Sequence, residues 1–356
     1  MKILITSDLH LKLTDANGII ENGLNSRLKD NLSILDTMAK STIDNHIDVV
    51  VIAGDIFDKI NPSEKLRKLF VDHFVSPLIK NNIGLIILMG NHDTNLDTVS
   101  FESEISILNS AGYDGIVLIR EVSVLEFNGK KAVFIPYGME SQIDEENKER
   151  ISYIFGHAGI KDAITGVGVK KRDGEEINKN VFRNYIYSFQ GHYHKPQIIK
   201  VGNCIIYYIG STQVRDYGER EDIKRYLILD TETDKVESVI LQDRKFIQVD
   251  IEEKTNTHYE DLLKKYEIKD NLVNLRFVGT EIWLKTQKFN EIKKLVESFG
   301  CHKVMITSKI IQDKNKIEIS LEGNQNEQEI IVEYAKKKKL DEETIQFGLE
   351  VFLSND

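Results

Sequence analysis

Side chains that commonly bind metal ions occur in five short motifs within about the first two hundred residues. Each motif follows a short apolar run that is typical of a buried strand. The motifs SDLH, GDIFD, GNHD, FGHA and GHYH supply seven candidate ligands, which are Asp8, His10, Asp55, Asn91, His157, His192 and His194. Two cations about 4 Å apart cleave or transfer phosphate esters by contacting both the attacking and the leaving oxygen. The motifs therefore predict a two-cation site for a phosphate ester.

The residue types indicate which of these side chains would bind each of the two cations. Asp8 and His10 alternate at the end of a predicted strand, so both side chains should point the same way and bind one cation. Asp55 ends the next strand, where one carboxylate could bridge both cations, and Asn91 offers a carbonyl oxygen to the second. The three remaining histidines complete the two sets. Oxygen and nitrogen ligands without sulfur suit manganese, iron or zinc.

His92 and Asp93 follow Asn91 directly and are predicted to act on the substrate. We assign His92 as a non-ligand that stabilises or protonates the leaving oxygen, with Asp93 orienting its ring.

Each motif alone is a weak signal, because an isolated Gly-Asp pair or a histidine after glycine is more often an ordinary turn or surface residue. The combination is much stronger, since five of the nine histidines fall in these motifs. The other four have no partner motif and are read as structural or surface residues: His46, His73, His258 and His302.

Composition restricts the partners and the compartment. The chain has 356 residues, 41% of them hydrophobic, which suits a large globular domain with smaller appendages. Its net charge of −10 does not attract nucleic acid, so contact with DNA would need local basic patches or a partner. Candidate patches are Lys161, Lys170, Lys171 and Arg172, and Arg215, Arg220 and Lys224. Two cysteines, and an apolar start too short for a signal peptide or a membrane span, predict a cytoplasmic protein.

The elements that must position the motifs begin with a strand over 2–6 and a helix over 25–45. A strand over 48–53, a helix over 63–80 and a strand over 85–89 follow. Strands that alternate with helices predict a sheet covered by helices, with ligands bound beyond the carboxyl ends of the strands. Shorter strands then continue to about residue 241, and Asn128-Gly129 signals a hairpin. We expect an α/β domain over residues 1–245, with an α/β/α or β-sandwich core flanked by helices.

The remaining third of the chain has a different organisation. Residues 246–321 show the order strand, helix, strand, helix, strand, which predicts a small α+β domain. The polar residues 322–327 are predicted to be a linker. Residues 328–353 contain two short amphipathic helices, the second with Asp341 as its N-cap.

The order and spacing of the motifs resemble those of the calcineurin-like metallophosphoesterase family. The resemblance covers about the first 240 residues. It implies that the seven candidate ligands hold two divalent metal ions and that His92 is catalytic. Manganese is the favoured metal, with magnesium, iron and zinc as alternatives.

The sequence GHYHKPQ, the later IGSTQ and the small domain after residue 245 resemble the repair-nuclease branch of that family, which holds the nuclease subunits of SbcCD-type double-strand-break complexes. The compact layout is similar to that of recombination endonuclease subunits of large bacteriophages. This resemblance implies a DNA exonuclease and endonuclease with a capping domain. It also implies a homodimer formed through helices near 63–80 and 97–110, and C-terminal helices that dock on an SMC-like ATPase.

Three alternatives stay open at this point. The protein could be a stand-alone phosphoesterase for small phosphodiesters or phosphomonoesters, and a role in binding alone would require a degraded ligand set. The C-terminal helices could also fold back on the chain itself, because two short helices bury little surface alone.

Overall fold

Short aliphatic runs build two facing sheets in the first part of the chain. The computed structural model describes residues 1–93, 115–164, 176–254 and 258–311, together with 327–338, 340–342, 344–346 and 349. The chain divides into two compact units. The first comprises Met1–Gln248, Tyr266–Asn274 and Val296–Val304, and the second comprises Val249–Lys265, Leu275–Leu295 and Met305–Asp356.

The first sheet has the amino-terminal strand near its middle. Among the described residues it contains six strands in the order β14-β13-β1-β4-β5-β6. Their bounds are β1 (Lys2–Thr6), β4 (Val49–Ala53), β5 (Gly84–Leu88), β6 (Ile116–Ile119), β13 (Arg225–Asp230) and β14 (Lys235–Ile240). The first four of these run parallel, whereas β13 pairs antiparallel with β1 and β14. The carboxyl ends of β1, β4 and β5 therefore meet at one end of the sheet.

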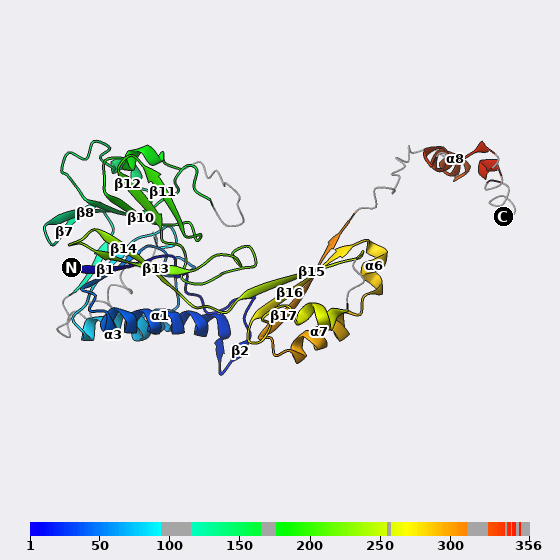
Figure 1. The fold of residues 1–356 in the computed structure, drawn as a ribbon, viewed down its shortest axis with the longest axis horizontal. Helices are drawn as coiled ribbons and strands as arrows, with labels where there is room; N and C mark the ends of the chain where they lie inside the picture. The colour runs from blue at the N-terminus through cyan, green and yellow to red at the C-terminus, as the bar shows by residue number, and fades with distance from the viewer. Residues whose placement is uncertain are drawn as a thin grey trace. The chain divides into compact units, whose positions relative to one another are not determined.

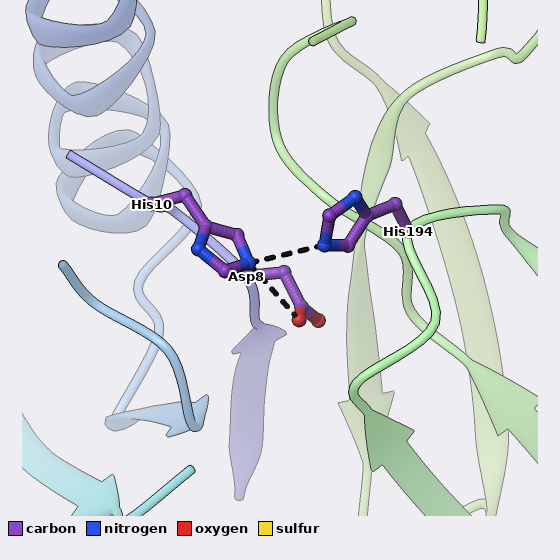
Figure 2. Close-up of side chains that lie close together, drawn as sticks. All are labelled: Asp8, His10 and His194. Atoms are coloured by element: carbon purple, nitrogen blue, oxygen red, sulfur yellow. Dashed lines mark hydrogen bonds and ion pairs between the residues drawn. The ribbon is translucent and has the colours of Figure 1, made fainter. Parts of the chain in front are cut away.

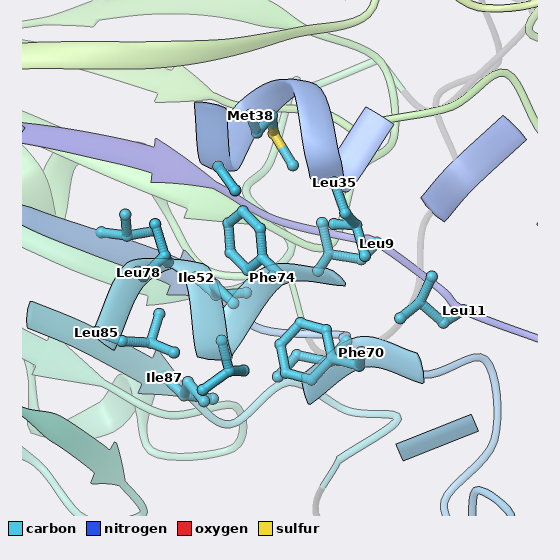
Figure 3. Close-up of a cluster of buried hydrophobic side chains, with 14 of the residues drawn as sticks. Leu9, Leu11, Leu35, Met38, Ile52, Phe70, Phe74, Leu78, Leu85 and Ile87 are labelled. Atoms are coloured by element: carbon cyan, nitrogen blue, oxygen red, sulfur yellow. The ribbon is translucent and has the colours of Figure 1, made fainter. Parts of the chain in front are cut away.

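Helices cover one face of this sheet. α1 (Ser26–Asp44) begins after Asn25, whose side chain caps it by accepting a hydrogen bond from the amide of Arg27. The predicted helix over 63–80 is a continuous run of α2 (Glu64–Phe70), the π-helical turn η1 (Val71–Val75) and α3 (Ser76–Lys80). Figure 3 shows the core between helices and sheet, which includes Leu35, Met38, Ile52, Phe70 and Phe74.

The second sheet follows the order β11-β12-β10-β9-β8-β7 within the described part of the chain. Its strands are β7 (Ser123–Phe127), β8 (Lys130–Ile135), β9 (Tyr153–His157), β10 (Tyr187–Gly191), β11 (Gln197–Val201) and β12 (Cys204–Tyr208). The predicted hairpin turn joins β7 to β8, and Asn128 and Gly129 have φ values of 50° and 79°. Two successive positive φ values are typical of the tight turn that Asn-Gly favours.

The two sheets pack face to face. Ile3 and Ile5 of β1 are buried against the second sheet, whereas Leu4 between them is buried against the helices. Phe134 and Phe155 stack within the same inter-sheet core at a centroid distance of 4.7 Å. Figure 1 shows α1 and α3 on one side of the first sheet and β8, β10 and β12 on the other. The predicted α/β fold, a sandwich of sheets flanked by helices, is confirmed.

Smaller elements complete the first unit. They are β2 (Ile20–Glu21), β3 (Leu24–Asn25) and the 3-10 turns η2 (Glu140–Gln142) and η3 (Lys179–Phe182). Phe182 of η3 is fully buried against the outer face of the second sheet.

A third sheet contains β15 (Phe246–Glu252), β16 (Leu272–Gly279) and β17 (Lys303–Ile310) in that order. Its helices are α5 (Tyr259–Leu263), α6 (Glu281–Thr286) and α7 (Phe289–Ser298). The short helix α6 was not predicted, although the hydroxyl of Thr280 caps it by accepting from the amide of Trp283. Phe277 packs against Trp283 and Phe289, with ring centroids 6.0 Å and 5.0 Å away.

The C-terminal segment contains α8 (Glu327–Lys337) as the first of the two predicted helices. The carboxylate of Asp341 accepts a hydrogen bond from the amide of Thr344 at 2.8 Å, as expected of the predicted N-cap. Residues 322–326 of the predicted linker, the predicted dimer helix over 97–110, and Lys170, Lys171 and Arg172 lie outside the described residues. Within the described part of the chain, no helix is both long and apolar enough to cross a membrane.

Candidate metal centre

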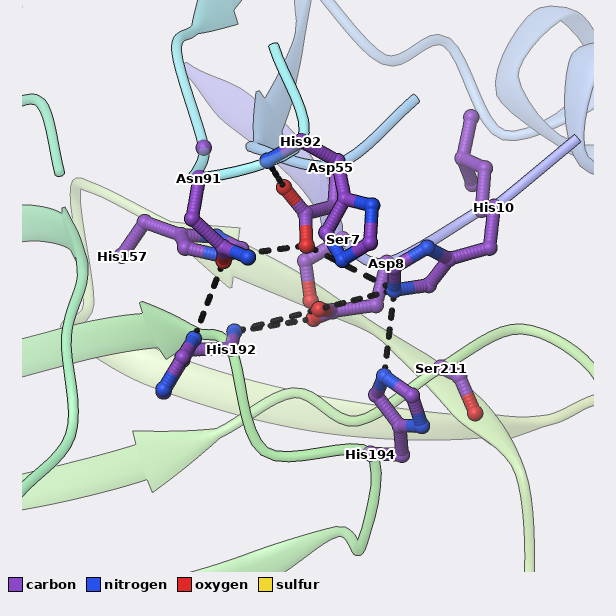
Figure 4. Close-up of polar contacts among 12 residues, drawn as sticks. Ser7, Asp8, His10, Asp55, Asn91, His92, His157, His192, His194 and Ser211 are labelled. Atoms are coloured by element: carbon purple, nitrogen blue, oxygen red, sulfur yellow. Dashed lines mark hydrogen bonds and ion pairs between the residues drawn. The ribbon is translucent and has the colours of Figure 1, made fainter. Parts of the chain in front are cut away.

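The seven predicted ligands meet where the carboxyl ends of both sheets come together. Asp8 and His10 follow β1, Asp55 follows β4, and Asn91 follows β5. From the second sheet, His157 ends β9, and His192 and His194 follow β10. Figure 4 shows these side chains converging on one site.

The loop after β1 differs from the expectation. Asp8 and His10 do not alternate on a strand, because β1 ends at Thr6 and both residues have left-handed φ values of 50° and 44°. Their amides donate hydrogen bonds to the carbonyls of Gly54 and Asp55 at 3.0 Å each, which ties this loop to the loop after β4. Each such conformation costs roughly 1 kcal/mol or more. The left-handed conformations of Asp8 and His10 therefore lower the stability of this loop but direct both side chains toward the site.

Two glycines make room for the ligands. A Cβ atom on Gly90 would lie 2.2 Å from Oδ1 of Asp55, and one on Gly54 would lie 2.3 Å from Nδ1 of His157. Gly54 also has a φ of +90°, a conformation that side chains rarely adopt. The glycines of GDIFD and GNHD are thus required by the space that the ligands occupy.

One group of potential ligand atoms forms around Asp8, His10 and His194 (Figure 2). The Nε2 atoms of His10 and His194 face each other at 3.0 Å, and Nε2 of His10 lies 3.7 Å from Oδ1 of Asp8. The carboxylate of Asp8 also accepts from the amide of His192 at 3.2 Å.

A second group forms around His157. Its Nε2 lies 3.0 Å from Oδ1 of Asn91 and 3.3 Å from Oδ2 of Asp55. The same Asn91 oxygen lies 3.1 Å from Nδ1 of His192. Oδ2 of Asp55 is also 3.5 Å from Nε2 of His10, so this carboxylate stands between the two groups. A carboxylate that bridges two cations would need such a position.

The residues present fit a pair of divalent cations. Asp8, Asp55 and His157 are at most 2% exposed, and buried carboxylates are costly unless cations balance them. The imidazole nitrogens of two histidines face each other beside these carboxylates, which places several lone pairs around a common point. The donors are oxygen and nitrogen only, a set that manganese, iron and zinc accept.

Neighbouring charges set the protonation of these groups. Burial would raise the pKa of Asp8, but the contact with His10 and the nearby His157 holds it well below its usual range. For Asp55, burial also acts to raise the pKa, and His157 outweighs it and lowers the value to about 2. Burial alone would lower the pKa of His157, but Asp55 and Asp8 raise it to about 10. The pKa of His10 falls to about 4, chiefly through burial.

These shifts predict that metal binding depends on pH. At neutral pH His157 carries a proton on the nitrogen that would bind a cation, because its pKa of about 10 lies above the solution pH. A cation must displace this proton, so the affinity for Mn²⁺ is expected to rise about tenfold per pH unit for each proton displaced. Calorimetric titration between pH 6 and pH 8, in buffers of different ionisation enthalpy, measures both the affinity and the released proton.

The variant His157→Gln is the control for this pH dependence. It is expected to bind metal more weakly and to lose the dependence, because glutamine has no proton to displace. An affinity of the original protein that stays constant across this range would contradict the assignment of His157.

His92 lies at the border of the cluster, but its ring is not held as predicted. The amide of His92 donates to Oδ1 of Asp55 at 2.9 Å, and Nδ1 of its ring lies 2.9 Å from the carbonyl oxygen of Asp58. Oδ2 of Asp93 instead accepts from the amides of Asp55 and Gly90 at 2.6 Å and 3.0 Å. The predicted orienting role of Asp93 is therefore corrected, because a backbone carbonyl takes that position and Asp93 joins two ligand loops.

Burial, with the nearby Asp55 carboxylate, raises the pKa of Asp93 to about 6. This shift fits a carboxyl group that is enclosed in the loops rather than exposed to substrate.

The basic residues after GHYH do not all face solvent. Lys224 is 2% exposed and pairs with Glu219 and Asp222, so it is not placed for the predicted contact with DNA. Arg215 forms an ion pair with Asp58 across the two sheets, and its Nη1 lies 3.4 Å from Nε2 of His194. Glu219 and Asp58 were not predicted as site residues. Glu219 belongs to no ligand motif, and Asp58 is the last residue of GDIFD, a position to which no role was assigned. Their contacts with His194 and Arg215 join residues 25 and 157 positions apart.

Comparison with known proteins places this geometry in a family. A family model described as calcineurin-like phosphoesterase matches residues 1–226. The DNA double-strand break repair protein Mre11 of Methanocaldococcus jannaschii is 24% identical over 362 residues, which cover 95% of this chain and 93% of that protein.

Two bacterial proteins, each named as the D component of the nuclease SbcCD, are also similar. The one from Staphylococcus saprophyticus is 25% identical and covers 78% of this chain and 77% of its own length. The one from Staphylococcus epidermidis is 22% identical and covers 97% of this chain and 95% of its own length. Because the family model covers more than half of the chain, including all the predicted ligands, the protein belongs to the calcineurin-like phosphoesterases, a family of metal-dependent enzymes with a dinuclear centre.

Proposed function

We propose that this protein is a two-metal-dependent DNA nuclease, with exonuclease and endonuclease activity, that processes double-strand breaks together with an SMC-like ATPase. The observation that carries the proposal is the convergence of seven ligands from both sheets at one buried site. The repair and nuclease names of the relatives, which are similar over most of the chain, support DNA as the substrate.

The metal centre would be held in two parts. Asp8, His10 and His194 would bind one cation, and Asn91, His157 and His192 the other, with Asp55 between them. We propose Mn²⁺ as the metal, with Mg²⁺, Fe²⁺ and Zn²⁺ as alternatives. When bound there, two cations would supply charge to polarise the phosphate and would activate a water molecule for in-line attack on phosphorus.

The protein's own residues would complete the chemistry. A ring nitrogen of His92 lies within 4.8 Å of potential ligand atoms of His10 and Asp55. The carbonyl of Asp58 holds Nδ1 of this ring, so Nδ1 carries a hydrogen and Nε2 can exchange a proton with the leaving oxygen. Asp93 would support this function indirectly by fixing the loops of Asp55 and Gly90.

A comparison of substrates tests the proposal. The protein is incubated with Mn²⁺ and with supercoiled plasmid, linear DNA or a chromogenic phosphodiester. Nicking of plasmid and shortening of linear DNA are expected, each abolished by a chelator. Hydrolysis of the chromogenic ester without any cleavage of DNA would favour the alternative, a phosphoesterase for small substrates.

The same proposal gives a role to each part of the chain after residue 245. We propose that residues 246–321 form a capping domain that steers DNA, that 322–327 are a linker, and that 328–353 bind the ATPase. We further propose a cytoplasmic homodimer formed in part by the helical run α2–η1–α3, which sedimentation analysis would test.

Removing the residues after 325 should separate cleavage from partner binding. The truncated protein is expected to remain folded and to cleave end-exposed or single-stranded DNA with Mn²⁺, because all the ligands precede this point. It should no longer co-purify with a co-expressed SMC-like ATPase, and any stimulation by ATP should be lost.

Matched point variants sharpen the truncation experiment. Ile331→Asp places a charge on a half-buried position of α8 and should also abolish co-purification, whereas Lys336→Ala, at an exposed position, should not. Truncation that unfolds the nuclease domain, or leaves the ATPase bound, would support helices that fold back on this chain.

A further inference from the structure

A buried glutamate that the proposed mechanism does not use lies behind His194. Glu219 is 7% exposed, and its Oε1 lies 2.9 Å from Nδ1 of His194. The other ring nitrogen of His194, Nε2, is the one that faces His10 inside the ligand cluster. A carboxylate accepts hydrogen bonds but cannot donate them, so this contact keeps the hydrogen on Nδ1 and leaves the lone pair of Nε2 for a cation.

A buried lysine holds the same histidine from its backbone. Nζ of Lys224 lies 2.8 Å from Oε2 of Glu219 and donates to the carbonyl oxygen of His194 at 3.1 Å. Oε2 of Glu219 also accepts from the amide of Arg215 at 3.2 Å. One ion pair therefore fixes both the ring and the main chain of His194.

A purely structural role explains this arrangement less well. Burying an ion pair costs about as much desolvation energy as its attraction returns, so a buried pair is weak evidence for stabilisation. Here both members contact the same residue, and that residue points its other ring nitrogen at the ligand cluster. The arrangement matches the general pattern in which a carboxylate orients a metal-binding histidine from behind.

The second ligand group is held differently. Nδ1 of His157 lies 2.8 Å from the carbonyl oxygen of Ala53, so a backbone carbonyl, and not a carboxylate, takes the position behind this ring. Loss of Glu219 should therefore affect the two cations unequally.

We propose that Glu219 and Lys224 are a positioning pair that presents Nε2 of His194 to one cation only, the one beside Asp8 and His10. This inference rests on the proposed two-cation centre. According to this inference, the pair controls the affinity of the site for that cation and does not control the folding of the domain.

The test measures metal binding by the full-length protein. Mn²⁺ is titrated into metal-free protein by calorimetry, and paramagnetic resonance reports whether two ions are coupled or one stands alone. In Glu219→Ala the affinity for one of the two ions is expected to fall about 10- to 100-fold, and the affinity for the other should change less than about twofold. Glu219→Gln, which keeps an oxygen that can accept from Nδ1, should fall between this variant and the original protein.

Two further variants distinguish a selective loss of one ion from a general loss of folding. Glu219→Gln combined with Lys224→Met removes the charge that Glu219→Ala leaves unpaired, and should still weaken one ion selectively. Asp222→Asn, which also faces Lys224 at 3.5 Å without being a partner of the ring, should bind both ions normally.

The outcomes separate this inference from the proposed function. An original protein that binds no Mn²⁺ overturns the proposed metal centre. An original protein that binds two ions, with variants that bind both equally well or lose both together with their melting transition, overturns the positioning pair alone.

Discussion

Replacing Asp55 by asparagine is expected to empty the metal centre and to lower DNA cleavage by at least about a thousandfold, since bound cations contribute several kcal/mol to lowering the barrier. Oδ2 of this carboxylate lies between His10 and His157, at 3.5 Å and 3.3 Å from their Nε2 atoms. Asparagine keeps an oxygen that can accept from the amide of His92 but removes the negative charge. Elemental analysis of protein dialysed against Mn²⁺ and rates of plasmid nicking measure both effects.

Variants of two other predicted ligands and of one distant carboxylate serve as comparisons for Asp55→Asn. Asp8→Ala and His192→Ala should also lose both metal and activity, because each residue belongs to the same cluster. Asp36→Ala removes a half-exposed carboxylate that pairs with His73 on the helical face, and should change neither property. An Asp55→Asn protein that retains two ions at full affinity would show that Asp55 does not bridge them.

Replacing His92 by alanine should have the opposite pattern, with little change in bound metal and a loss of about 10²- to 10⁴-fold in turnover, the usual effect of removing a general acid. The reason is that the Asp58 carbonyl fixes Nδ1 of the ring, while the His92 amide, which the substitution retains, makes the contact with Asp55. Single-turnover cleavage at saturating Mn²⁺, with metal content measured on the same samples, distinguishes chemistry from metal loss.

A drop in metal content would change the assignment of His92. Its ring nitrogen is near enough to His10 and Asp55 to bind a cation, so a His92→Ala protein with an empty site would make it a ligand. His46→Ala, outside every motif, is the control for general effects of losing an imidazole.

Much of the architecture was predictable because apolar spacing and turn residues both point to the strands, helices and turns that the structure contains. The run of aliphatic residues over 2–6 is a strand, and the apolar spacing around Leu35 and Met38 is a helix with a buried face. The Asn128-Gly129 pair forms the expected hairpin because those residues tolerate positive φ. Likewise, the motifs located side chains that gather at one site, because residues that follow neighbouring parallel strands meet at the same end of a sheet.

The missed features depend on contacts that local patterns do not encode. The left-handed conformations of Asp8 and His10 arise from hydrogen bonds to a loop more than forty residues away. Asp93 follows His92 directly, yet its oxygen is drawn to two backbone amides instead. Glu219 and Lys224 stand among other charged residues in the sequence, whereas in the structure both are buried and contact the ring and the carbonyl of His194.

The order of the ligands along the chain has a consequence for protein synthesis. The contacts of Asp8 with His192 and of His10 with His194 each join residues that are 184 positions apart. Chains grow at roughly 5–20 residues per second, so the first ligands leave the ribosome many seconds before their partners. A nascent or prematurely terminated chain that stops before β10 cannot assemble the centre. The synthesising cell would therefore be exposed to a DNA-cutting activity only after more than half of the polypeptide exists.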